Sequence, residues 1–285
     1  MSPTERRRRS TTAVSLRWSL VALTATIIGV WWWTEQPRHR TRVIAAVKRA
    51  GGAFQLDDPD PMRPAMPRGN PARAFLDEVG GAGLGHEISV VNLDGVRATD
   101  ADLAAVGALR GLRRLYLNGS PITDASLTRL SGLRDLEVFE AQETTLGDAG
   151  LRHLAGLSRL RSLALTESRA GDSGMALLAR LTCLDELSLG RTDVGDAGLR
   201  HLSGLVGLKV LRLGRTRVTD AGLAHLANLG HLEYLDLSHT AVTDAGLTRL
   251  AGLADLKILI VEGTKVTDAG QVAMRRALPA LRIVR

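Results

Sequence analysis

Residues 184–205, LDELSLGRTDVGDAGLRHLSGL, contain the pattern that decides the fold. In residues 187–189 two leucines flank a serine, which is the alternation of a half-buried β-strand. After Asp196, the apolar residues Leu199 and Leu202 follow at the spacing of one helix face. The stretch therefore predicts a short strand, a tight turn and a short helix.

This unit recurs every 24 residues without an insertion, and an aspartate marks the same place in each copy. The aspartates are Asp100, Asp124, Asp148, Asp172, Asp196, Asp220, Asp244 and Asp268. Fixed self-similarity at this period, with a leucine frame, is typical of an α/β leucine-rich-repeat solenoid. Each carboxylate precedes a predicted helix, where it can accept the free N–H groups of the first turn. We therefore predict that the aspartates are structural N-caps.

Stacking the copies places their strands in one parallel sheet, with leucines between sheet and helices. Strands pack about 4.8 Å apart, closer than helices do, so we expect parallel strands on the concave face and short helices on the convex face. In the third copy Phe139 and Ala141 replace two leucines, and in the last Gln271 stands where a leucine is expected. Residues 275–285 are interpreted as a C-terminal cap with a final strand near 281–284.

The repeats resemble those of a known class of proteins. The form T-D-A-G-L, in residues 219–223 and 243–247, looks like the leucine-rich repeats of planctomycete-type bacteria. It is also similar to the repeats of F-box leucine-rich-repeat proteins. The resemblance covers residues 88–285 and implies protein recognition on the concave face, without catalysis by the repeats. No F-box-like helical module precedes the repeats, which weakens a ubiquitin-ligase interpretation.

The positive charge of the chain lies outside the repeats. Residues 1–75 carry 13 Lys/Arg and 5 Asp/Glu, whereas residues 76–285 carry 24 and 25. A nucleic-acid-binding protein should have its basic surface on the folded domain. We therefore expect no nucleic-acid partner, and we assign the basic residues to a tail and to membrane flanks.

Residues 18–33, WSLVALTATIIGVWWW, contain no charged side chain. At about 1.5 Å per residue they approach the thickness of a bilayer core, and aromatic rings favour its interfaces. We predict one transmembrane helix, whose interface residues are Arg17, Trp18, Trp31, Trp32 and Trp33. A cleaved signal peptide is the alternative, but no small-residue cleavage site follows. Arginines flank both ends, so the side of the membrane stays open, with an exported repeat domain as the default.

These patterns divide the chain into five parts. We expect a basic tail at 1–15, a membrane anchor at 16–34, and a juxtamembrane helix with a possible cap at 35–56. A proline-rich linker follows at 57–75. Residues 76–285 form the repeat domain, with eight 24-residue repeats and the C-terminal cap.

No pattern of catalytic chemistry stands out. The aspartates occupy equivalent places in separate repeats, so capping explains them better than catalysis does. His153, His201 and His225 share one helix position, but no further ligands recur beside them, and we expect no metal site. The one cysteine, Cys183, excludes an internal disulfide and is interpreted as a small buried filler. We expect no enzyme activity, no cofactor and no small-molecule substrate.

Specificity should lie in the strand residues that point away from the leucine core. Glu143 and Glu167 are followed along the array by Arg191 and Arg215, which predicts a concave face that is acidic first and basic next. The alternative is a mixed, solvated surface without a binding role. Tyrosines can serve as anchors for a partner. The candidate binding residues are Arg114, Tyr116, Glu140, Gln142, Glu186, Arg212, Arg215, Tyr234 and Asp236.

The sequence therefore favours a membrane-anchored module that binds a protein on a concave repeat surface. One alternative is an intracellular adaptor or F-box-like substrate-recognition protein. Another is an enzyme with an unrecognised site, which would need a pocket of converging polar groups.

Overall fold

The structure is a computed structural model that describes residues 45, 51–56 and 88–285. The chain divides into two compact units, residues 1–45 and 46–285, and all strands and helices described belong to the second. The predicted anchor (16–34), linker (57–75) and interface tryptophans lie outside the described residues. Among the described residues, no helix has the length and apolar character needed to cross a membrane.

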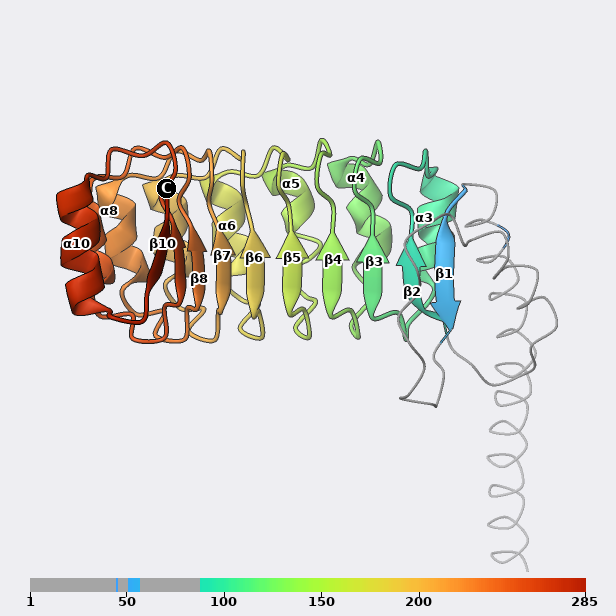
Figure 1. The fold of residues 1–285 in the computed structure, drawn as a ribbon. Coiled ribbons are helices and arrows are strands. Elements are labelled where there is room, and N and C mark those ends of the chain that lie inside the picture. Colours follow the sequence, from blue (N-terminus) through green and yellow to red (C-terminus); the bar gives the residue numbers. More distant parts are fainter. Residues whose placement is uncertain (1–44, 46–50, 57–87) are drawn as a thin grey trace, which may run out of the picture. The chain divides into compact units, whose positions relative to one another are not determined.

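The strands form one sheet whose spatial order follows the sequence. They are β1 (Ala53–Leu56), β2 (Ile88–Asn92), β3 (Arg114–Tyr116), β4 (Val138–Glu140), β5 (Ser162–Ala164), β6 (Glu186–Ser188), β7 (Val210–Arg212), β8 (Tyr234–Asp236), β9 (Ile258–Ile260) and β10 (Arg282–Val284). From β2 to β10 every neighbouring pair is parallel, as the repeat predicts (Figure 1). The last strand is the one expected in the C-terminal cap.

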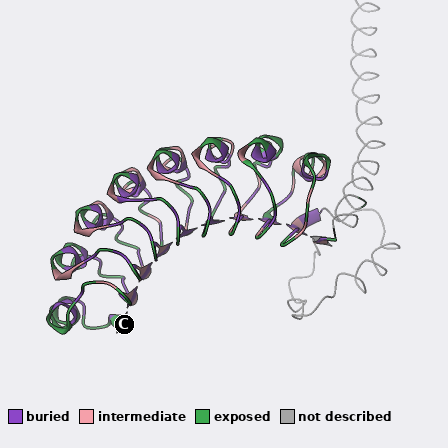
Figure 2. Cartoon of the chain, turned by 90° about the horizontal axis from the view of Figure 1, so that it is seen from above, coloured by how far each residue is buried: buried purple, intermediate pink, exposed green. Residues whose placement is uncertain are grey.

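One short helix follows each of the strands β2 to β9. The helices are α3 (Asp100–Gly107), α4 (Asp124–Leu127), α5 (Asp148–Leu151), α6 (Asp172–Leu178), α7 (Asp196–Leu202), α8 (Asp220–Leu223), α9 (Asp244–Leu247) and α10 (Asp268–Ala277). Three continue as 3-10 turns, η1 (Thr128–Leu130), η2 (Ala224–Leu226) and η3 (Thr248–Leu250). The repeats bend into an arc with strands on its inner side and helices on its outer side (Figure 2). Helices need about 8–10 Å between axes and strands about 4.8 Å, which produces this curvature.

The core is a continuous stack of leucines between sheet and helices. The strand register places Leu163, Leu187, Leu211 and Leu235 in one row, and each has no exposed surface. Phe139 extends this row and is also fully buried, as is Ala141. The two substitutions in the third copy are thus accommodated inside the core.

Strand β1 closes the N-terminal end of the sheet. It pairs antiparallel with β2, with Ala53 opposite Asn92 and Gln55 opposite Val90. An uncovered strand edge presents unpaired backbone groups that favour aggregation. Residues 53–56 therefore cover the edge of the first repeat.

The aspartates occupy a different position from the predicted one. Each is the first residue of its helix, and the N-cap is the residue before it, in extended conformation. The N-caps are Thr99, Thr123, Gly147, Gly171, Gly195, Thr219, Thr243 and Thr267. The N-cap assignment is therefore wrong for Asp100, Asp124, Asp148, Asp172, Asp196, Asp220, Asp244 and Asp268.

The carboxylates instead bond to the following repeat. In each aspartate from Asp124 to Asp244, the carboxylate oxygen Oδ1 accepts a hydrogen bond from the backbone N–H of the next helix's N-cap residue, at 2.7–2.8 Å. Asp172 also accepts the N–H of Gly198, the third residue of α7, at 2.9 Å. A carboxylate of one repeat thus neutralises the positive end of the next helix. We call the aspartates from Asp124 to Asp244 staples, because each one joins its own repeat to the next.

This staple explains the glycine of the D-A-G motif. A Cβ on Gly198 would lie 2.6 Å from Oδ1 of Asp172, closer than side chains can approach. Equivalent glycines, such as Gly174 and Gly222, face the carboxylate of the preceding repeat in the same way. In these repeats the carboxylate fills the space that a side chain would occupy. In the second repeat Ser126 takes the glycine position, and its hydroxyl donates to Asp100 at 3.2 Å.

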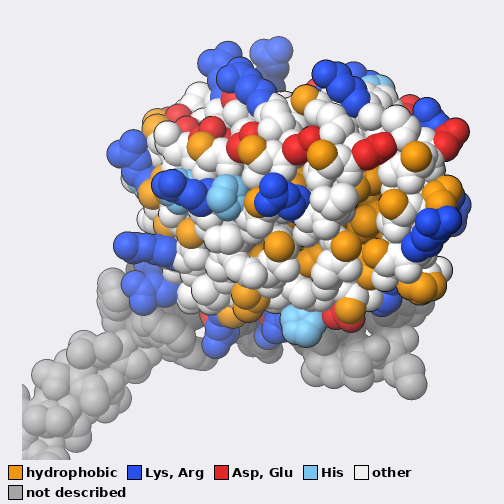
Figure 3. Space-filling model, turned by 90° about the vertical axis from the view of Figure 1, so that its left-hand side faces the viewer, with side chains coloured by type: hydrophobic (Ala, Val, Ile, Leu, Met, Phe, Trp, Pro, Cys, Tyr) orange, Lys and Arg blue, Asp and Glu red, His pale blue; other side chains and the backbone are white. Residues whose placement is uncertain are grey.

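The last helix, α10, carries a buried polar defect. Gln271 stands in the core position of Leu247 one repeat earlier and is 6% exposed. Its Nε2 has no hydrogen-bond partner among the described residues, while its Oε1 accepts from Arg275. Figure 3 shows this end of the solenoid, with hydrophobic side chains gathered on one side and basic side chains spread over the surface.

Replacing Gln271 by leucine is expected to raise the free energy of unfolding by about 1–3 kcal/mol, because a buried, unpaired amide is removed. Chemical denaturation of the two full-length proteins measures the difference. Gln271→Ala is the control, since it removes the amide but leaves a cavity. A Gln271→Leu protein no more stable than the parent would contradict the assignment of a defect.

Candidate functional site

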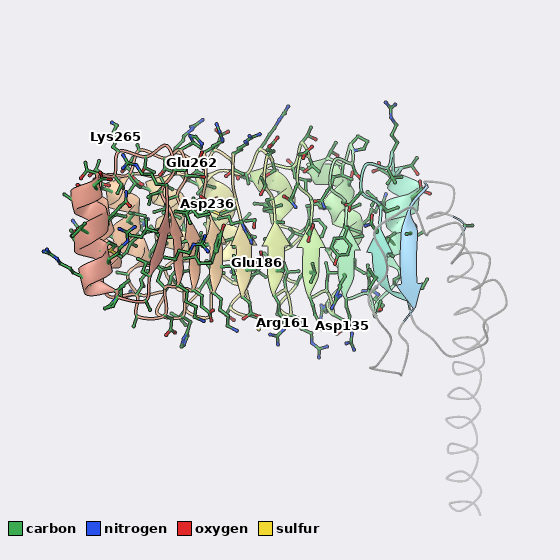
Figure 4. The ribbon with its side chains drawn as sticks, viewed as in Figure 1. Asp135, Arg161, Glu186, Asp236, Glu262 and Lys265 are labelled. Carbon is green, nitrogen blue, oxygen red and sulfur yellow. The ribbon has the colours of Figure 1, made fainter. Side chains whose placement is uncertain are left out.

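The strand register arranges the predicted binding residues in two rows on the concave face. The first row holds Arg114, Glu186 and Tyr234, and the second holds Tyr116, Glu140, Arg212 and Asp236. Gln142 follows β4 on the same face, and Arg215 follows β7 at the edge of that face. In Figure 4, Glu186 and Asp236 lie on the sheet, whereas Glu262 and Lys265 lie near the edge where the strands end.

Arg212, Glu186 and Tyr234 form one cluster. The guanidinium of Arg212 makes an ion pair with Glu186 and donates to Oγ of Ser188 at 3.1 Å. It also lies over the ring of Tyr234, 5.1 Å from the ring centroid, in cation–π geometry. The charge of Arg212 is thus already balanced within the protein. The cluster presents a preorganised, nearly neutral surface rather than a free cation.

A second cluster surrounds Tyr116. Burial raises the pKa of its phenol, the charge of Arg114 opposes this shift, and the charges of Glu140 and Asp94 add to it. The phenol therefore stays protonated at neutral pH and can donate a hydrogen bond. Asn118 donates to Glu140 at 3.0 Å, which fixes that carboxylate beside the ring.

The two tyrosines lie far apart. Tyr116 is on β3 and Tyr234 on β8, so five strand intervals of about 4.8 Å separate them by roughly 24 Å. Between them the outward-facing positions hold the small residues Ser162 and Ala164 on β5, flanked by the longer side chains of Glu140 on β4 and Glu186 on β6. The structure thus gives two polar clusters, with the small side chains of β5 between them.

Each repeat has two inward-facing core residues in and just after its strand, such as Leu187 and Leu189. The residue two positions after the second of them has a left-handed backbone. Its φ is positive in every repeat from β2 to β9, between 54° and 67°. These residues are Gly95, Gly119, Glu143, Glu167, Arg191, Arg215, His239 and Gly263. Glycine adopts this region freely, whereas a side chain costs roughly 1–2 kcal/mol.

Inter-repeat hydrogen bonds impose this conformation. The N–H of Arg191 donates to the carbonyl of Gly214 at 2.8 Å, and that of Arg215 to Ser238 at 2.7 Å. Thr192 closes the turn by donating its hydroxyl to the carbonyl of Leu189 at 2.6 Å. The backbone ladder fixes the turn without using the side chain of the left-handed residue.

We call Glu143, Glu167, Arg191, Arg215 and His239 the charged ridge. Its charge order was visible in the sequence, but its backbone conformation was not considered there. A signal was available, because Gly95, Gly119 and Gly263 occupy the same position in the other repeats. The ridge runs along the edge of the sheet where the strands end.

The opposite edge, where the strands begin, carries a ladder of alternating charge that sequence reasoning missed. Its residues, spaced 24 apart, are Arg113, Glu137, Arg161, Asp185, Lys209, Glu233 and Lys257. Ion pairs join Arg161 to Asp185 at 3.1 Å and Lys257 to Glu233 at 2.6 Å. Asp135 and Arg161 mark this edge in Figure 4. Exposed pairs of this kind contribute little individually.

A hollow of about 260 Å³ at this edge is lined by Glu137, Arg159, Arg161 and Cys183. Cys183 is exposed there, so its interpretation as a buried filler is wrong. The residue comes before the strand, at a position that faces solvent. In the part of the chain that is described, no group of three or more His, Cys, Asp or Glu could hold a metal ion.

Comparisons with known proteins agree with this fold. A family model described as "Leucine Rich repeat" matches residues 230–251. Among solved structures, an internalin (inlF) from Listeria monocytogenes str. 4b F2365 is 25% identical, covers 68% of this chain and 52% of its own, and has a TM-score of 0.58. Internalin C2 (inlC2) from the same strain is 27% identical, covers 70% and 80%, and has the same TM-score of 0.58.

The chain spans about half the length of the first of these structures. No curated protein sequence matches it. The matched repeat, the parallel sheet and the alternating short helices together define a leucine-rich-repeat solenoid.

Proposed function

We propose that this protein is a recognition module that binds a protein partner on the concave face of its repeats. The observation that carries the proposal is a contrast between two sets of positions. Inward-facing positions are leucine or another apolar residue throughout, whereas outward-facing positions on the same strands differ from repeat to repeat. A solenoid offers such an extended concave surface for binding.

Two features of the face support a protein rather than a small molecule as the partner. The clusters at Tyr116 and at Tyr234 lie roughly 24 Å apart, which a macromolecule can bridge. Tyrosine and arginine are also the residues that most often dominate protein interfaces. We assign the partner contacts to Arg114, Tyr116, Glu140, Gln142, Glu186, Arg212, Arg215, Tyr234 and Asp236.

Site-specific photocrosslinking tests this proposal. A photoreactive amino acid at Tyr234, in the full-length protein in cells, is expected to give an adduct of defined mass. The matched control is Ala197, which is exposed on the helix face of α7. Adducts from both positions alike, or from neither, would exclude recognition through the concave face.

The proposal includes attachment to a membrane through residues 16–34. Its support is the uncharged run with tryptophans at both ends. The test is protease digestion of a C-terminal tag on intact cells, with permeabilised cells as the control. Digestion in intact cells supports an exported repeat domain. Protection until lysis would exclude export and favour the intracellular adaptor.

A further inference from the structure

The charged ridge retains side chains where the fold does not need them. In the flanking repeats Gly95, Gly119 and Gly263 make the same turn at φ 64–67°. At Arg215 and Glu143 the backbone N–H groups make the same ladder bonds as the glycines do. A glycine would therefore adopt this backbone conformation at least as easily. The side chains add a conformational cost, and the ladder hydrogen bonds do not depend on them.

The ridge also differs from the rest of the surface in how its charges are balanced. Glu167 and Arg191, in its middle, form an ion pair at 2.5 Å. Arg217 is close by, but it is paired with Asp193, also at 2.5 Å. Glu143 and Arg215 are exposed and have no side-chain partner among the described residues. One free negative and one free positive charge thus flank a neutral pair.

The spacing of these two free charges is set by the backbone ladder. Glu143 and Arg215 are three repeats apart. From Glu143 to Arg215, the N–H of each ridge residue donates to the carbonyl of the residue just before the next ridge residue, at 2.7–2.9 Å. At about 4.8 Å per repeat, the two residues lie roughly 14 Å apart. An extended chain covers this distance in about four residues.

We propose that the charged ridge determines partner specificity, and that it binds an extended polypeptide segment with the reverse charge order. A basic side chain of the segment pairs with Glu143, and an acidic side chain about four residues away pairs with Arg215. This inference rests on the proposed function, since it names the partner chemistry for the edge of the same concave surface. The structure assigns the contact by charge complementarity and by the fixed spacing of the ridge.

Two labelled peptides of identical composition test the charge order. One is Lys-Lys-Ser-Ser-Ser-Glu-Glu, and the other, Ser-Lys-Glu-Glu-Lys-Ser-Ser, places no basic side chain more than two residues from an acidic one. Fluorescence anisotropy with the full-length protein at low ionic strength is expected to show tighter binding of the first, by about threefold to fivefold. Equal affinity for the two peptides would overturn the proposal.

Glycine substitution separates binding from stability. In Arg215→Gly the preference for the first peptide is expected to disappear, while the melting temperature equals or exceeds that of the parent. Arg217→Ala is the matched control, because this arginine lies in the same turn but outside the ridge; it should keep the preference. A fall in melting temperature in Arg215→Gly would assign a structural role and overturn the proposal.

The photocrosslink at Tyr234 distinguishes the two levels of inference. If the adduct forms and Arg215→Gly leaves its yield unchanged, the ridge does not determine specificity, although concave recognition stands. If Arg215→Gly removes the adduct while Arg217→Ala keeps it, the ridge is supported with the cellular partner.

Discussion

Replacing Leu211 by alanine is expected to lower the free energy of unfolding by about 2–5 kcal/mol. Leu211 has no exposed surface and lies in register between Leu187 and Leu235. Its truncation removes contacts with both neighbouring repeats and leaves a cavity in a row that cannot collapse without bending the sheet. In a solenoid each repeat is stabilised mainly by its neighbours, so the loss weakens two interfaces at once.

Urea denaturation followed by circular dichroism measures this effect. Val206→Ala is the control, because Val206 is 56% exposed and its truncation should change stability by no more than about 0.5 kcal/mol. A lower denaturant dependence in Leu211→Ala would show that the array unfolds in parts on either side of the defect. Equal midpoints for the two variants would contradict the central role of the leucine row.

The architecture was predictable because individual leucines and aspartates recur at a fixed spacing of 24 residues. The alternation in residues 187–189 predicted β6 at Glu186–Ser188, and the 24-residue spacing then placed the other parallel strands. Helix length was less predictable: α5 has 4 residues and α7 has 7, although both begin with D-A-G-L. The residues that follow, RHLAGL after α5's first four and RHLSGL after α7's, differ only in Ala155 and Ser203, so the local sequence does not distinguish the two lengths.

The aspartates show why a correct pattern led to a wrong role. Their position before each apolar helix face is what an N-cap would have, so Asp196 was assigned to its own helix. Its actual partner, Thr219, is 23 residues away in sequence and adjacent only after the repeats stack. The glycine that recurs two residues after the aspartate, from Asp148 to Asp268, was the available signal, since a packed helix rarely needs glycine there.

The candidate binding face was predictable as a set of residues but not as a set of contacts. Alternation along each strand identified Glu186 and Arg212 as outward-facing. That Arg212 is neutralised by Glu186 and covers Tyr234 follows from side-chain conformation across strands. The left-handed backbone of Arg215 likewise depends on a hydrogen bond to the next repeat.

Replacing Asp196 by alanine is expected to lower the free energy of unfolding by about 2 kcal/mol. Its carboxylate accepts the N–H of Thr219 at 2.8 Å and the hydroxyl of Thr219 at 2.6 Å. Without it, the first turn of α8 loses its anionic partner and the N-cap amide loses its acceptor. The control is Asp193→Ala, whose carboxylate takes part only in an exposed ion pair with Arg217.

The staple made by Asp244 also predicts acid sensitivity. In Asp244 the bond from the Thr267 hydroxyl, followed by the Thr267 N–H bond, lowers the pKa below its ordinary value of 3.8, with a smaller contribution from Gly270. A carboxyl whose folded pKa is lowered stabilises the protein above its unfolded pKa and loses this effect as the pH falls through the folded value. The stability difference between the parent and Asp244→Ala should therefore shrink as the pH is lowered below about 4. A difference that stays constant down to pH 2 would exclude an ionised staple.

A double-mutant cycle shows whether the carboxylate and the glycine form one unit. A Cβ on Gly222 would collide with Oδ1 of Asp196, so Gly222→Ala alone should destabilise the protein by about 1–3 kcal/mol. In Asp196→Ala/Gly222→Ala the space is vacated, and alanine favours the helix over glycine by about 1 kcal/mol. The double variant should thus be more stable than the sum of the single effects predicts, with a coupling of about 1–3 kcal/mol. Additive effects would mean that Gly222 is conformationally required and that the D-A-G motif is not explained by the staple.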